Sequence, residues 1–364
     1  MIDPPPLPSS PIVTGTSNHD PGAAETGTQG LTPAMARAIA RAAARRIDIC
    51  RLDLTGRVVV TEAATGAYGV TAAAAAAVGA RVHAITADSR HGSAASASAD
   101  VRAIASSLDV DPLSIAITTD RNELPIEKVD VITNSGFVRP LDDELITRLP
   151  SQAVIALMYE AWEARSSDID YGTAAARGIA VVGVDEHHPA CDAFRFVGDL
   201  AMYGIRRRSW PVRDSRITVL SDNLFAQPIA DAIRANGGHV TAGGIDVASS
   251  NPADIVVVAM TPGASAAGAA DPADIATAIT ASGAYGCVQV WGDIDRAKLA
   301  STDVAIEPTD EPPPGHQGVS MNAAGFEAVV RLQVAGLAAV QHRDAPETSP
   351  LHGLAQTLSA EEPG

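Results

Sequence analysis

Short apolar runs alternate with stretches of helical spacing between residues 57 and 182. The runs are rich in Val and Ile, as in buried strands, and the stretches between them place apolar residues on one helical face. Strands are predicted at 57–61, 81–86, 115–118, 129–133, 153–157 and 179–182, and helices at 68–78, 100–108, 142–149 and 169–177. Strands joined by helical crossovers are typical of a doubly wound α/β domain with a parallel sheet.

A second, shorter series of the same kind begins at Arg216. Its predicted strands are 216–220, 239–241, 254–259, 286–290 and 304–306, and its predicted helices are 225–235 and 273–280. A helical stretch, 193–206, and the pair Trp210-Pro211 separate the two series, because proline restricts the residue before it. The predicted fold class is therefore α/β, with two doubly wound Rossmann-like domains and an inter-domain cleft.

The ends of the chain differ from these two series. Helices are also predicted at 32–46, behind a Thr-Pro start, and at 321–341. Pro, Ser, Thr and Gly dominate the first 30 residues, which therefore cannot bury enough apolar surface to fold, and the chain end has a similar composition. The predicted organisation is a disordered tail (1–30), a nucleotide-binding domain (31–208), a smaller substrate domain (209–318), a crossing helix (319–343) and a flexible tail (344–364).

The composition and charge of the chain exclude some classes of binding partner. The 364 residues carry a formal net charge of −17, and such a field repels nucleic acid and anionic membrane surfaces, so neither is an expected partner. No apolar run is long enough to span a membrane, and the N-terminal segment lacks the pattern of a signal peptide. Three distant cysteines argue against a disulfide framework. We expect a cytoplasmic protein, in which the apolar stretch 321–341 offers a surface for a homodimer.

The run VVVTEAATGAYG at 58–69 joins a strand to Ala64-x-Gly66-x-x-Gly69 and an alanine-rich helix. This is a dinucleotide-binding fingerprint with its first glycine replaced by alanine. In such a turn Gly66 brings its backbone to the pyrophosphate, Gly69 permits close packing of the helix, and Tyr68 lies between them. The alternative is that both glycines only build a strand-to-helix turn.

Acidic and basic residues at the end of the second strand fit the same cofactor. Asp88 follows Gly69 at the distance where an acidic side chain accepts hydrogen bonds from an adenosine ribose. Arg90 comes two residues later and is placed to meet a 2′-phosphate. The predicted cofactor is therefore NAD or NADP.

Polar residues also follow the next three predicted strands, at the edge where ligands bind in open α/β sheets. Small polar residues after the fourth strand leave room for a nicotinamide ribose, and titratable groups after the fifth and sixth are candidates for binding and proton transfer. These residues are Asn134, Ser135 and Gly136 after the fourth strand, Glu160, Glu163 and Arg165 after the fifth, and Glu186 and His188 after the sixth. For the loop 158–168 the alternative is a solvated helix start with internal ion pairs.

Histidine is the expected acid or base, because a histidine held by a carboxylate commonly moves the proton in hydride chemistry. His188 and His316 both precede predicted helices, and either fits this role, as does a role in capping or hydrogen bonding alone. We expect no metal, because the adjacent His187 and His188 point in different directions and lack a spaced pair of partners.

Over about residues 55–340 the chain resembles the D-2-hydroxyacid dehydrogenase superfamily, and more weakly the cofactor domains of adenosylhomocysteinase-type enzymes. The likeness rests on 130–134, 153–155 and 168–170 in the first series, and on 216–220, 253–258 and 288–295 in the second. In the family the substrate domain comes first, so the resemblance implies a permuted domain order. The family's catalytic arginine would fall nearest Glu160, with Arg165 as the substitute, and Glu186 would match its glutamate.

These features predict an NAD(P)-dependent oxidoreductase that acts on a small polar metabolite in the inter-domain cleft. The hydride would move through the nicotinamide and the proton through His188 or His316. The alternatives are a lyase or hydrolase that uses Glu160, Glu163 and His188 on the same scaffold, and a non-catalytic ligand-binding protein.

Overall fold

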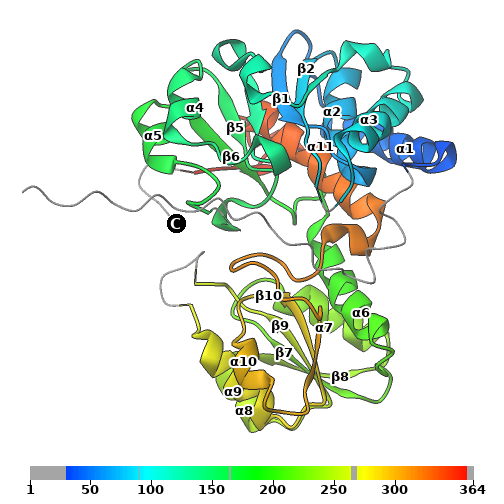
Figure 1. Ribbon diagram of the computed structural model, residues 1–364, viewed down its shortest axis with the longest axis vertical. Helices are drawn as coiled ribbons and strands as arrows, with labels where there is room; N and C mark the ends of the chain where they lie inside the picture. The colour runs from blue at the N-terminus through cyan, green and yellow to red at the C-terminus, as the bar shows by residue number, and fades with distance from the viewer. Residues whose placement is uncertain (1–29, 90, 164, 264–268, 359–364) are drawn as a thin grey trace, which may run out of the picture.

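The computed structural model describes residues 30–89, 91–163, 165–263 and 269–358. Two parallel sheets lie in separate parts of the molecule, each covered by helices, and α6 (Val197–Arg207) leads from the first to the second (Figure 1). The predicted fold class is confirmed by these two sheets. The domain boundaries stay predictions.

The first sheet has the strand order β3-β2-β1-β4-β5-β6, followed by an antiparallel edge strand, β12 (Ala355–Thr357). The parallel strands are β1 (Val58–Glu62), β2 (Arg81–Ile85), β3 (Ala116–Thr118), β4 (Val131–Thr133), β5 (Val154–Ala156) and β6 (Ala180–Val184). The order reverses between β1 and β4, so the loops after these two strands diverge. Open α/β sheets bind ligands in the crevice that forms at such a point.

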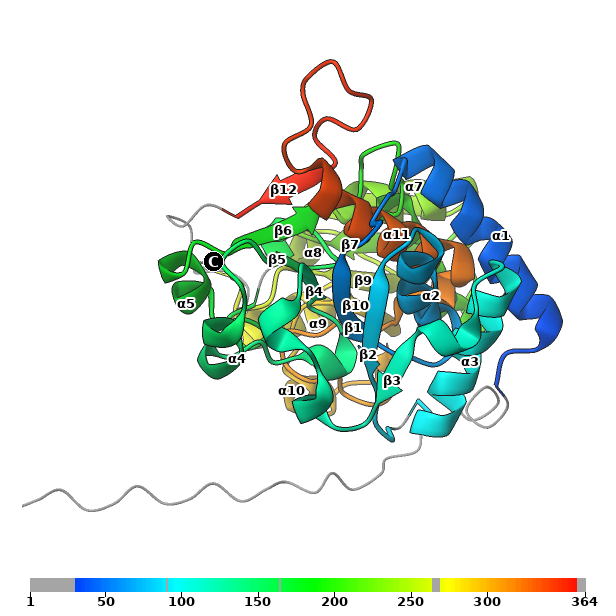
Figure 2. The same cartoon turned by 90° about the horizontal axis from the view of Figure 1, so that it is seen from above.

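Helices cover both faces of this sheet (Figure 2). One face carries α1 (Pro33–Cys50), α2 (Val70–Ala77) and α3 (Ala94–Ser107), and the other carries α4 (Asp143–Arg148) and α5 (Tyr171–Ala176). Short polar side chains begin most of them, because the first amides of a helix have no partner inside it. These caps are Thr32, Ser93, Asp142 and Asp170.

The second sheet is parallel throughout, in the order β8-β7-β9-β10-β11. Its strands are β7 (Arg216–Leu220), β8 (His239–Gly243), β9 (Ile255–Ala259), β10 (Gly286–Trp291) and β11 (Ala305–Glu307), and its helices are α7 (Ala226–Ala235), α8 (Ile245–Ser250), α9 (Pro272–Ala281) and α10 (Arg296–Leu299). The sequence pattern did not indicate α8 and α10, which are too short to establish a helical period.

The long helix α11 (Phe326–His342) returns from the second sheet to the first, where it packs against α1, α2 and β6. A Cβ built on Gly336 would lie 3.0 Å from the Met158 sulfur, so the glycine permits close contact with the end of β5. Gln333 accepts a 2.6 Å hydrogen bond from the Thr71 hydroxyl in α2. Because α11 is covered within its own chain, it does not supply the homodimer surface expected from its apolar sequence.

The flexible tail predicted for 344–364 is wrong for residues 345–358. β12 pairs with β6, and the preceding turns bury Leu351 and Leu354. The segment is too short and polar to show a strand pattern, and only the exposed edge of β6 gives its amides partners. The tail predicted for 1–30 lies outside the described residues except for Gly30.

Replacing Leu354, which is 0% exposed, with Ala is expected to lower the free energy of unfolding by about 2–4 kcal/mol, because a core leucine leaves a cavity. Leu113→Ala is the matched control, since Leu113 is 79% exposed. Urea denaturation measures both. Equal stability of the two variants would show that residues 345–358 do not contribute to the core.

Candidate functional site

Three buried glutamates lie at the carboxyl ends of β5 and β6. Glu160, Glu163 and Glu186 are 1%, 6% and 5% exposed. Glu160 accepts hydrogen bonds from the Trp162 indole and, at 2.9 Å, from the Glu186 backbone amide. We call these three residues the glutamate cluster. The solvated alternative for the loop 158–168 is therefore wrong for Glu160 and Glu163.

Burial and mutual repulsion disfavour the ionised forms of this cluster. Burial first, and then the Glu160 charge, raises the pKa of Glu163 to about 7. Burial and the Glu163 charge raise the pKa of Glu186 well above its ordinary range, and burial also raises the pKa of Glu160. A carboxyl group that titrates near neutral pH can both donate and accept a proton.

Aromatic rings cover the cluster on the side of the second sheet. Trp162 makes edge-to-face contacts with Phe225 and Trp291, with ring centroids 5.9 and 5.5 Å apart. Phe225 begins α7 and Trp291 ends β10, so the rings join the two parts of the molecule. Burial is the largest cause of the raised pKa values of the glutamates, and Trp162 contributes to it by its contact with Glu160.

A second polar group lies at the carboxyl ends of β4 and β5. Asn134 is 2% exposed, and its side-chain amide donates a 2.6 Å hydrogen bond to the Tyr159 hydroxyl. Arg139 forms a 3.0 Å ion pair with Asp168. Among the described residues, neither Asn134 Oδ1 nor the buried Arg165 Nε has a hydrogen-bond partner. Both atoms are therefore buried polar groups whose hydrogen-bonding capacity is unused within this part of the chain.

The turn after β1 is already engaged within the protein. The Gly66 amide donates a 2.8 Å hydrogen bond to Asp100 Oδ2, so the expected contact of this amide with a pyrophosphate is replaced by one with a carboxylate. A Cβ on Gly69 would lie 3.0 Å from the Ala64 carbonyl oxygen and 3.2 Å from Val101. Gly69 thus permits close packing against α3. The Tyr68 hydroxyl interacts with Ser320.

Two other expected cofactor contacts are also made internally. Ser135 bonds to the Thr133 hydroxyl at 2.7 Å. A Cβ on Gly136 would overlap the Glu62 carboxylate, so this glycine makes room for a carboxylate of the same chain. Burial raises the pKa of Glu62, and the Arg139 charge opposes this shift.

Asp88 accepts a 2.8 Å hydrogen bond from the Ala94 amide at the start of α3. Beside it, a cavity of about 390 Å³ lies at the carboxyl ends of β2 and β3, lined by Thr86, Ser98, Thr118 and Glu123 among others. Within the described part of the chain, the buried Thr86 hydroxyl has no hydrogen-bond partner. Arg90 lies outside the described residues.

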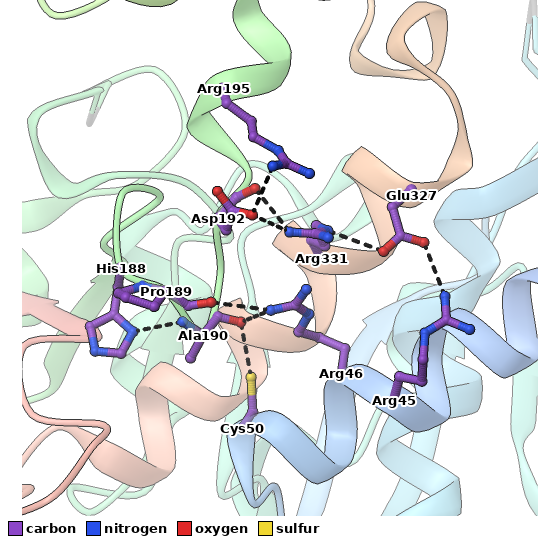
Figure 3. A network of polar contacts seen from close by, with 10 residues as sticks. All are labelled: Arg45, Arg46, Cys50, His188, Pro189, Ala190, Asp192, Arg195, Glu327 and Arg331. Carbon is purple, nitrogen blue, oxygen red and sulfur yellow. Dashed lines mark hydrogen bonds and ion pairs between the residues drawn. The ribbon is translucent and has the colours of Figure 1, made fainter.

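The two candidate histidines each contact backbone of their own loop. His188 Nδ1 accepts a 3.0 Å hydrogen bond from the Ala190 amide, and Arg46 and Cys50 contact the Ala190 carbonyl oxygen on the other side of this loop (Figure 3). His316 is exposed and contacts the Pro314 carbonyl oxygen at 3.0 Å. Their predicted role in proton transfer stays a prediction.

Several site residues were missed by sequence reasoning. Asp100 is 34 residues from Gly66, and only packing brings them together, whereas Trp162 lies two residues from Glu160 in the same loop. Tyr159 was part of a polar loop but had no assigned role. The signal available in the sequence was the position of a polar residue directly after a predicted strand. This signal identified Asn134, Glu160 and Glu186.

No protein-family model matches the sequence, and no curated protein matches it significantly. A dipicolinate synthase chain from Bacillus subtilis is similar in structure, with a TM-score of 0.50 and 12% identity over 80% of this chain and 98% of that chain. The dipicolinate synthase chain from Bacillus halodurans gives 0.48, with 10% identity over 78% and 97%. NAD+-bound 3-phosphoglycerate dehydrogenase from Entamoeba histolytica gives 0.46, with 10% identity over 80% and 96%. The first of these shows that the chain has a known two-domain α/β fold.

In the described part of the chain, no helix is long and apolar enough to cross a membrane, and no group of three or more His, Cys, Asp or Glu side chains is arranged to hold a metal ion.

Stability is expected to fall as pH rises from about 4.5 to about 7, because folded Glu163 keeps a proton that the unfolded chain releases. Glu163→Gln removes this loss and is expected to raise the free energy of unfolding at pH 8 by about 2 kcal/mol. Urea denaturation across this pH range measures the change. Glu144→Gln, at an exposed position, is the control. Parallel pH profiles for wild type and Glu163→Gln would contradict the shifted pKa.

Proposed function

We propose that this protein is an NAD(P)-dependent oxidoreductase that acts on a small polar metabolite, with a buried glutamate in place of histidine as the acid or base. The observation that carries the proposal is the glutamate cluster, whose three carboxyl groups lie at the ligand-binding edge of the first sheet and face the second domain. A group with a pKa of about 7, as at Glu163, is suited to proton transfer at neutral pH.

The edge of the first sheet supports a dinucleotide in two places. Strands β2 and β4 flank β1, and the residues after them, Thr86 and Asn134, each have a buried polar atom without a partner in the described structure. A dinucleotide lying across this edge would place its adenosine near Thr86 and Asp88, and its nicotinamide ribose near Asn134. When bound, the nicotinamide supplies or accepts the hydride.

The chain's own groups would bind substrate and move the proton. The Arg165 guanidinium, whose Nε has no partner among the described residues, would hold an anionic or carbonyl oxygen of the substrate. Glu163 or Glu186 would donate the proton to a carbonyl oxygen during reduction and take it back during oxidation. The aromatic contacts of Trp162 would keep water from these carboxyl groups.

A second candidate is a cofactor-free lyase or hydrolase that uses the same glutamate cluster. The bond between the Gly66 amide and Asp100 favours it, because the turn then has one less donor for a phosphate. Nucleotide binding separates the two candidates.

Titration with NADH and NADPH is expected to raise the melting temperature and change the nicotinamide fluorescence with one of the two, since a ligand that binds only the folded state stabilises it. The preferred nucleotide settles the choice between NAD and NADP. If neither nucleotide has an effect, the oxidoreductase proposal is removed and the cofactor-free candidate stands.

Glu163→Gln and Glu186→Gln are expected to lower kcat by about 100-fold or more, because general acid–base groups contribute this much. His188→Ala and His316→Ala are the matched controls and are expected to keep kcat within about threefold of wild type. The assay follows NAD(P)H consumption with a set of small carbonyl compounds. A large loss in either histidine variant, with full activity in both glutamine variants, would return the proton-transfer role to histidine.

A further inference from the structure

One carboxylate of the chain is bound to the fingerprint turn. Asp100 lies in the middle of α3 and is 4% exposed. Its Oδ2 accepts a 2.8 Å hydrogen bond from the Gly66 amide, and its Oδ1 accepts a 2.7 Å hydrogen bond from the Leu31 amide just before α1. Both oxygens of a buried anion are thus bound to backbone donors.

The conformation of the turn is one that favours glycine. Gly66 has a φ of +64°, and its amide donates to Asp100 in α3. A Cβ built on Gly66 would meet no atom within 4 Å, so the space beside the turn is open. A carboxylate oxygen and a phosphate oxygen both accept a hydrogen bond from such an amide.

Two buried polar atoms on either side of the turn independently indicate a ligand. Thr86 is 1% and Asn134 2% exposed, and Thr86 Oγ1 and Asn134 Oδ1 have no hydrogen-bond partner in the described structure. They follow β2 and β4, the neighbours of β1 in the sheet. An unsatisfied buried polar group is costly, and a ligand that crosses the turn would satisfy both.

We propose that Asp100 is an internal substitute for the pyrophosphate and that its withdrawal from Gly66 sets the affinity for a dinucleotide. This rests on the proposed function, because it concerns the cofactor of the same site. Two anions cannot share one amide, so the cofactor binds only when the Asp100 carboxylate moves away. Since the same carboxylate holds the Leu31 amide, cofactor binding also releases the start of α1 from α3.

The test compares wild type with Asp100→Asn, which keeps one carbonyl oxygen for a backbone amide but removes the negative charge. Binding of NADH, NADPH and inorganic pyrophosphate is measured by calorimetry, and folding is verified by circular dichroism. Asp111→Asn, which removes the same charge at an exposed cap beyond the end of α3, is the control. Asp100→Asn is expected to bind pyrophosphate and the preferred nucleotide at least tenfold more tightly than wild type, and Asp111→Asn is expected to bind them as wild type does.

The two proposals fail in different ways. If Asp100→Asn gains affinity for pyrophosphate but neither protein binds NADH or NADPH, the role of Asp100 stands and the oxidoreductase proposal is removed. If wild type binds a nucleotide and Asp100→Asn binds it equally or more weakly, the role of Asp100 is overturned and the oxidoreductase proposal stands.

Hydrogen exchange of the wild-type protein gives a test without a variant. At a saturating concentration of the nucleotide that binds, the Leu31 amide is expected to exchange at least tenfold faster, because its acceptor has moved. An unchanged exchange rate at Leu31 would show that Asp100 stays in place, and would overturn the proposal.

Discussion

The return of α11 to the first domain is the constraint on which the candidate site depends. This helix is buried against α1, α2 and β6, and its Arg331 forms ion pairs with Asp192 and Glu327 (Figure 3). Asp192 closes the loop after β6, where the Glu186 carbonyl oxygen accepts the amides of Ala193 and Phe194. A helix from the far end of the chain thus holds the loop that carries Glu186.

The glutamate cluster is costly to bury. Desolvation raises the pKa of all three carboxyl groups, and this lowers stability wherever they must ionise. Packing of Trp162 against Phe225 and Trp291 gives apolar and aromatic contact energy that offsets part of this cost. Ionisable groups that are buried at an electrostatic cost to stability are common at functional sites.

At the same edge of the sheet, some polar groups are hydrogen-bonded within the chain and others have no hydrogen-bond partner in the described structure. Asp100, Glu62 and Asp88 each bind backbone amides of their own chain, whereas Thr86 and Asn134 keep polar atoms without partners in the described structure. Contacts within the chain therefore compete with ligand contacts at the turn after β1. Ligand binding at this turn therefore depends on the charges beside it as well as on its glycines.

The sequence by itself determined the order of the parallel strands and of the longer helices in both domains, because apolar periodicity and helix caps are local properties. It also identified the edge that carries Asn134, Glu160 and Glu186, since residues after parallel strands meet there. Only the tertiary structure decided that Asp100 takes the Gly66 amide, that His188 caps a loop, and that Ala355–Thr357 forms an edge strand. Each of these depends on a partner distant in sequence or on a side-chain direction, and neither has a periodic signal along the chain.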